Sequence, residues 1–165
     1  MKYIKANGIE DNELYYFEID ERGAAYRQVS FAEGRCRVSI APDFQLCETE
    51  VEIFDGDEEI TPEAFEEVWH TAVEPYKNAW EETKRQYRPG TTVTGTIQMF
   101  YPQGVIIRLV GESYAVANDP VLRMHTPPAW MYPGYQVEGT VGGADESNFW
   151  IKLESCRVTG KRTDS

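Results

Sequence analysis

The sequence predicts two domains, an acidic α+β domain followed by an all-β barrel. Three observations support this organisation: strand and helix patterns are mixed in residues 1–88, only strand patterns follow, and Pro89-Gly90 separates the two regions. The 165 residues are 41% hydrophobic and 27% charged, which is typical of folded globular domains. We therefore place one domain at 1–88 and a second at 89–165.

An antiparallel meander over residues 13–40 is predicted in the first domain. Aromatic and β-branched side chains fill residues 14–19, and Gly23 and Gly34 mark turns between three successive strands. Polar and apolar residues alternate along the third strand, 35–40, so one face should be buried and the other solvated. A weaker strand is predicted over 49–54.

A helix is predicted after the meander. Thr61 is a suitable N-cap, and Pro62 suits the first helical position. Apolar residues recur every three or four positions over 65–80, which predicts a face that covers the meander. Pro75 has no backbone N–H to donate, so the helix should kink or split close to it.

Five strand patterns follow Pro89-Gly90, with a loop rich in proline and aromatic residues, 119–133, after the third. Residues 89–97 and 133–141 share five identical positions of nine, including a glycine within each strand that permits the coiling of a small barrel. Five strands with a break after the third are the order of an OB-fold. The predicted strands are 91–100, 105–110, 114–117, 136–141 and 149–158.

These motifs resemble the S1 family of RNA-binding domains. The resemblance lies in Gly95-Thr96-Ile97, in Phe100 with residues 103–109, in 134–141 and in 151–153. It implies a five-stranded OB-fold barrel that binds single-stranded RNA at one outer face. The candidate nucleic-acid-binding residues near that face are Tyr101, Arg108, Tyr114, Trp150 and Lys152.

The chain departs from the S1 pattern at four usual contact positions. The family's two outward aromatic residues correspond to Gln103 and Ile106 in this chain. Its basic or imidazole group corresponds to Ala117, and its arginine corresponds to Trp150. Since stacking contributes about 1–3 kcal/mol per base, the resemblance implies that RNA binding by this barrel is weak.

Three stretches of the first domain, 1–5, 18–29 and 60–69, resemble a class of small uncharacterised bacterial domains. Some members of that class occur in gene neighbourhoods suggestive of toxin immunity. The resemblance therefore implies an immunity or adaptor-like role, and it assigns no functional residue.

The net charge of −12 is concentrated in the first domain. Residues 1–88 hold twenty-one Asp and Glu against ten Lys and Arg, a net of −11. Such a domain repels a phosphate backbone and attracts a basic protein. A second hypothesis therefore stays open, in which the first domain binds a basic protein partner through Asp55, Asp57, Glu58 and Glu59.

Patterns that would indicate catalysis or a metal site were sought and not found in the sequence. The acidic run 55–61 lacks the ligand and glycine spacing of a calcium-binding EF-hand loop. The two histidines lie in different domains, and the three cysteines form no Cys-x-x-Cys motif. We expect a protein that is no enzyme and has no cofactor and no metal.

No apolar run is long enough to cross a membrane, and residues 1–5 do not open a signal peptide. We therefore expect a cytoplasmic protein with no membrane partner. The sequence leaves open the partner itself, the oligomeric state and the packing of the two domains.

Overall fold

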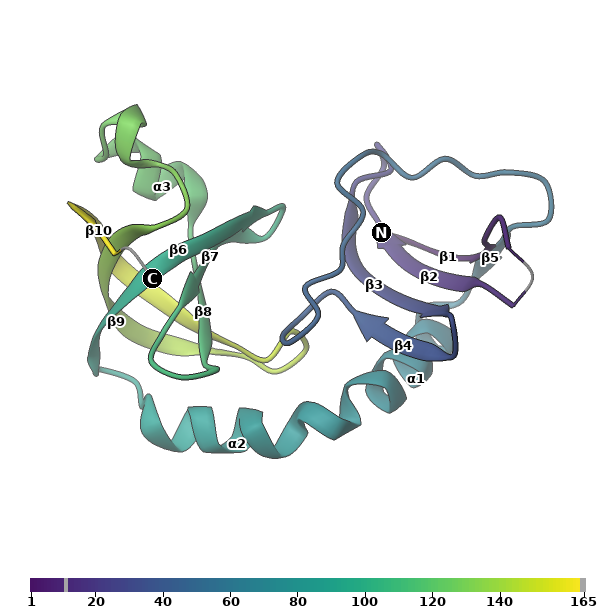
Figure 1. Ribbon diagram of the computed structural model, residues 1–165, viewed down its shortest axis with the longest axis horizontal. Coiled ribbons are helices and arrows are strands. Elements are labelled where there is room, and N and C mark those ends of the chain that lie inside the picture. The colour runs from purple at the N-terminus through teal and green to yellow at the C-terminus, as the bar shows by residue number, and fades with distance from the viewer. Residues whose placement is uncertain (11, 164–165) are drawn as a thin grey trace. The chain divides into compact units, whose positions relative to one another are not determined.

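The computed structural model describes residues 1–10 and 12–163 (Figure 1). The fold is rich in β-structure, with one five-stranded sheet and one closed five-stranded barrel, and it fits the predicted α+β class. The chain divides into two compact units, of which the first is Met1–Tyr76 and the second begins at Lys77. No helix in the described part of the chain is long and apolar enough to span a membrane.

The first unit contains the five-stranded sheet, in the order β4-β3-β2-β1-β5. All neighbouring strands are antiparallel, and β2, β3 and β4 confirm the predicted meander. The strands are β1 (Lys2–Asn7), β2 (Leu14–Ile19), β3 (Ala25–Ala32), β4 (Arg35–Val38) and β5 (Glu58–Ile60).

Two parts of this sheet differ from the sequence prediction. The prediction of a strand over 49–54 is wrong, because this segment is irregular and its Val51 N–H donates to the Gly23 carbonyl at 2.7 Å. The acidic stretch at 58–60 instead forms the edge strand β5 beside β1, a strand that the sequence analysis did not predict. Glu58 lies opposite Lys5, and such an opposite-charge pair stabilises two neighbouring strands.

The helical segment consists of α1 (Pro62–Val73), the 3₁₀ turn η1 (Glu74–Tyr76) and α2 (Lys77–Gln86). The Thr61 hydroxyl accepts a hydrogen bond from the Ala64 N–H at 3.1 Å, which confirms the predicted N-cap. The 3₁₀ turn contains Pro75, so the predicted interruption is also confirmed.

α1 covers one face of the sheet, and it packs against β1, β3 and β4. Phe65, Trp69 and Val73 of α1 are buried. Phe65 also contacts Tyr3 of β1, with 5.1 Å between the ring centroids. The part of the predicted apolar face that lies in α1 therefore does cover the meander, whereas Trp80 at its end belongs to the buried cluster of the second unit.

The second unit contains the closed barrel, whose strands neighbour one another in the order β10-β8-β7-β6-β9. β8 and β10 are parallel, and the other neighbouring pairs are antiparallel. The break after the third strand holds the short helices α3 (Asp119–Met124) and η2 (Pro128–Trp130). The strands are β6 (Thr92–Tyr101), β7 (Gly104–Arg108), β8 (Tyr114–Ala117), β9 (Tyr135–Asp145) and β10 (Trp150–Arg162).

The barrel core explains why the units divide at Tyr76, whereas the predicted boundary follows Arg88. Trp80 and Tyr87, in and just after α2, belong to the same buried cluster as the inward-facing barrel residues. Pro89-Gly90 ends the helical region but does not separate α2 from the barrel. The main inward-facing residues are Val93, Ile97, Val105, Ile107, Ala115, Val137, Val141, Ile151 and Leu153.

Candidate functional site

Three of the predicted nucleic-acid-binding residues meet on the outer face of β7, β8 and β10. Arg108 lies opposite Tyr114 across the β7–β8 pair, and Lys152 lies opposite Val116 across the β10–β8 pair. Tyr114 and Val116 share a face because they are two residues apart, and Ala115 between them belongs to the barrel core. Arg108, Tyr114 and Lys152 therefore form one outward-facing group, called here the β7–β8–β10 face.

Charge and an aromatic ring are both accessible on this face. Arg108 and Lys152 are exposed, and neither forms an ion pair with any other residue that the structure describes. Tyr114 is half-buried, and its burial raises the pKa of the phenol, with the Arg108 cation opposing and Glu112 adding to the shift. The phenol therefore stays protonated at neutral pH, and Tyr114 lies opposite Arg108 across the strand pair.

The other two predicted residues form a pair of contacting rings. The centroids of Tyr101 and Trp150 are 5.9 Å apart, and the rings are tilted relative to each other. Trp150 is only 1% exposed, so its ring offers no free surface for a base. Burial also raises the pKa of the Tyr101 phenol. The five predicted residues thus separate into the three of the β7–β8–β10 face and a pair in which Trp150 is buried and Tyr101 is half-buried.

Of the four positions where the S1 pattern expects contacts, Gln103 is half-buried, and the other three are buried. Ile106 on β7 is fully buried, and Ala117 on β8 belongs to the barrel core. Neither residue can contact a base from its present position. Among the predicted contact residues, Arg108 and Lys152 are therefore the exposed ones.

The predicted acidic residues lie at the edge of the sheet in the first unit. Asp55, Glu58 and Glu59 are exposed, while Asp57 is half-buried and accepts a hydrogen bond from the Phe54 N–H at 2.9 Å. Asp57 therefore closes a turn. Glu58 and Glu59 project from β5, the edge strand of the sheet.

A groove that the sequence analysis did not predict lies beside these acidic residues. It has a volume of about 630 Å³ and lies between the sheet and the irregular segment before β5. The strand residues Ala6, Tyr15 and Phe17 line one side of it. Its signal in the sequence is the length of the segment between the fourth and fifth strands of the first unit, β4 and β5.

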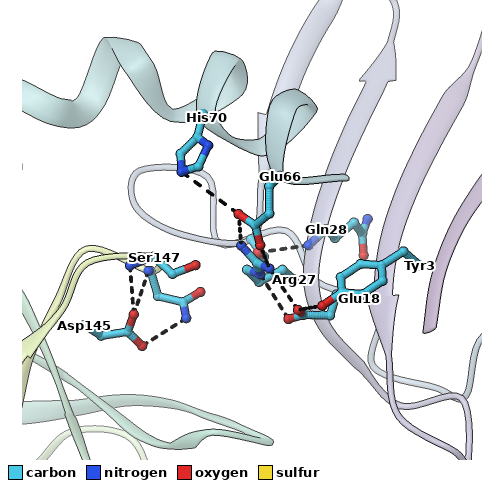
Figure 2. Close-up of polar contacts among 10 residues, drawn as sticks. Tyr3, Glu18, Arg27, Gln28, Glu66, His70, Asp145 and Ser147 are labelled. Carbon is cyan, nitrogen blue, oxygen red and sulfur yellow. Dashed lines mark hydrogen bonds and ion pairs between the residues drawn. The ribbon is translucent and has the colours of Figure 1, made fainter. Parts of the chain in front are cut away.

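A buried ionic cluster joins the sheet to α1 (Figure 2). Arg27 of β3 is 5% exposed and donates hydrogen bonds to Glu18 at 3.0 and 2.8 Å, and also to Glu66 of α1. The Tyr3 hydroxyl donates to Glu18 at 2.9 Å. Burial alone would lower the pKa of Arg27, but its hydrogen bonds to the two carboxylates raise it. Arg27 therefore stays charged, and its hydrogen bonds connect β2, β3 and α1.

No group of three or more His, Cys, Asp or Glu side chains within residues 1–10 and 12–163 is arranged to hold a metal ion. No protein-family model and no curated protein matches this sequence. Its function is therefore inferred from its own residues and their geometry.

Proposed function

We propose that the chain is a non-catalytic binding protein, and that its barrel is an S1-type OB-fold that binds single-stranded RNA weakly. The observation that carries the proposal is the meeting of Arg108, Tyr114 and Lys152 on the β7–β8–β10 face. OB-folds bind oligonucleotides on the face of their second and third strands, which correspond here to β7 and β8. The strand order around the barrel also supports an OB-fold.

The chemistry of the face fits a short contact with one base and two phosphates. The Tyr114 ring can stack on a base, and Arg108 and Lys152 can neutralise phosphates. Two phosphate contacts predict a shallow salt dependence, with a slope of about −1.4 for log K against log salt concentration. We expect micromolar or weaker affinity, because a single half-buried ring supplies the stacking.

The test is fluorescence anisotropy with a labelled, mixed-sequence, single-stranded RNA and the full chain at low salt. Arg108→Ala and Tyr114→Ala should each weaken binding by about tenfold, since stacking alone contributes about 1–3 kcal/mol. Arg85→Ala is the matched control, because Arg85 is an exposed arginine of α2 that already pairs with Glu82. No binding at low salt, or an equal loss in the control, contradicts the proposal.

A second candidate function is binding of a basic protein by the first unit. Residues 1–76 hold nineteen Asp and Glu against six Lys and Arg, a net charge of −13. The same count for residues 77–165 gives nine acidic and ten basic residues, a net of +1. Because no Lys or Arg occurs from Val38 to Tyr76, the segment that holds Asp55, Asp57, Glu58 and Glu59 favours a cationic partner.

A further inference from the structure

One face of the sheet in the first unit is covered by an irregular segment. Residues 39–57, between β4 and β5, form neither helix nor strand, and Figure 1 shows them as a long connection. Leu46, Cys47 and Val51 of this segment pack against a small cluster around Phe17. Loops of this length without secondary structure are uncommon in compact domains and often bind ligands.

The segment is held to the sheet at a few points. The Cys47 N–H donates to the Gln28 side-chain oxygen at 2.7 Å, and the Val51 N–H donates to the Gly23 carbonyl at 2.7 Å. Gly23 has a φ of +92°, and a Cβ at this position would lie 3.0 Å from the Val51 carbonyl oxygen. The contact at Val51 therefore needs glycine at the turn between β2 and β3.

Open space remains between the segment and the sheet. The groove of about 630 Å³ adjoins a smaller one of about 300 Å³, and both are lined by Tyr15, Phe17 and Cys47. Phe54 also lines the larger groove and is 66% exposed, and its chain neighbour Ile53 is 54% exposed. The groove therefore contains several apolar and aromatic side chains, one of which is largely uncovered.

The rim of the larger groove is acidic. Glu50, Glu52 and Asp57 line it, and residues 48–59 contain seven Asp and Glu with no Lys or Arg. An anionic ligand such as a nucleic acid would be repelled here, whereas a cationic ligand with an apolar part would match both the rim and the interior.

We propose that this groove binds a basic peptide segment of a partner protein. An apolar side chain of the peptide packs against Phe17 and Phe54, and flanking Lys or Arg side chains pair with Glu50 and Glu52. The inference rests on the protein-binding role proposed for the first unit. It is independent of RNA binding by the barrel.

The test uses the full chain and labelled nonapeptides in fluorescence anisotropy at about 50 mM NaCl. One set carries a central Leu, Ile, Met, Phe or Trp between Lys and Arg residues, and a reference set carries a central Ser. We expect at least one apolar-centred peptide to bind about tenfold more tightly than its Ser-centred counterpart, because the groove buries the apolar side chain.

Two variants test whether the peptide binds in the groove. Phe54→Ser and the double variant Glu50→Gln/Glu52→Gln should each weaken binding by about tenfold. Glu63→Gln/Glu74→Gln is the matched control, because it removes the same charge at exposed positions of α1 and η1 that do not line the groove. Melting temperatures no lower than that of the unchanged chain exclude a loss of folding.

Three outcomes overturn the inference. Equal binding of Ser-centred peptides, or an equal loss in the control variant, indicates attraction by surface charge alone. Absence of binding by every peptide at low salt excludes the groove as a basic-peptide site. If Arg108→Ala abolishes RNA binding but leaves peptide binding unchanged, the peptide site is independent of the proposed function of the barrel.

Discussion

At the scale of single residues, Arg27 joins a helix to a sheet through one buried charge. Its guanidinium bonds to Glu18 and Glu66 and lies 4.9 Å from the ring centroid of Phe65. Removing one partner of such a buried group leaves the other charge uncompensated. We expect Arg27→Ala to lower the free energy of unfolding by about 3–5 kcal/mol in urea denaturation.

An ion pair at the surface is the control for the stability loss expected in Arg27→Ala. Arg85 and Glu82 pair on α2 with both side chains mostly exposed, and such pairs contribute about 0–1 kcal/mol. Arg85→Ala should therefore change the free energy of unfolding very little. An equally small change in Arg27→Ala would mean that the buried cluster contributes no more than a surface pair.

The pKa of the Cys156 thiol can be used to test whether this side chain is buried. Burial raises the pKa of its thiol to about 11, because the charged thiolate is disfavoured away from water. The thiolate is the reactive form, so alkylation of the native protein should stay slow at pH 8.5 and rise toward pH 11. Mass spectrometry of iodoacetamide-treated protein gives this pH profile residue by residue. A midpoint near pH 8.5, the value of a free cysteine, contradicts the prediction.

At the scale of elements, the first turn of α1 depends on one side chain. The Thr61 hydroxyl satisfies the Ala64 N–H, which has no partner within the helix. We expect Thr61→Ala to lower the free energy of unfolding by about 1 kcal/mol. Thr71→Ala on the same helix is the control, because the Thr71 hydroxyl bonds to the Glu67 carbonyl and alanine is the better helix former. An equal loss in both variants contradicts a capping role.

The same elements indicate what the sequence can predict. Capping and proline signals are local, so the start of α1 and its interruption at Pro75 were predictable. β5 is only three residues long and forms through its pairing with β1, a distant partner that no local pattern reveals. Residues 49–54 form no strand in the structure, so the local sequence gave the wrong prediction there.

The candidate sites divide in a similar way. The resemblance to the S1 family predicted that Arg108, Tyr114 and Lys152 lie near one face, and strand alternation explains why their side chains point outward. Alternation does not predict which outward-facing side chains are then covered, so the burial of Trp150 became visible only in the structure. The groove lined by Tyr15 and Phe17 depends on the path of an irregular segment, which no periodic pattern encodes.

At the scale of the whole molecule, charge is distributed very unevenly, and this distribution lowers the stability of the first unit. The net charge of −13 on residues 1–76 implies repulsion among its own carboxylates, most strongly in residues 48–59. The Debye length is about 30 Å at 0.01 M salt and about 3 Å at 1 M, so added salt should screen this repulsion. We expect the melting temperature to rise with NaCl concentration.

Variants that each neutralise one carboxylate distinguish the repulsion among the carboxylates from the attraction between Glu58 and Lys5. Asp55→Asn and Glu59→Gln remove exposed charges and should raise the melting temperature at low salt, with the gain vanishing near 1 M NaCl. Glu58→Gln is the control, because Glu58 lies opposite Lys5 and its loss removes an attraction as well. If all three variants shift the melting temperature equally at low salt, net charge alone governs the effect. If only Glu58→Gln fails to raise the melting temperature, the pair of Glu58 and Lys5 offsets part of the repulsion. The other exposed carboxylates of residues 48–59 then reduce stability, and they remain available to a cationic partner.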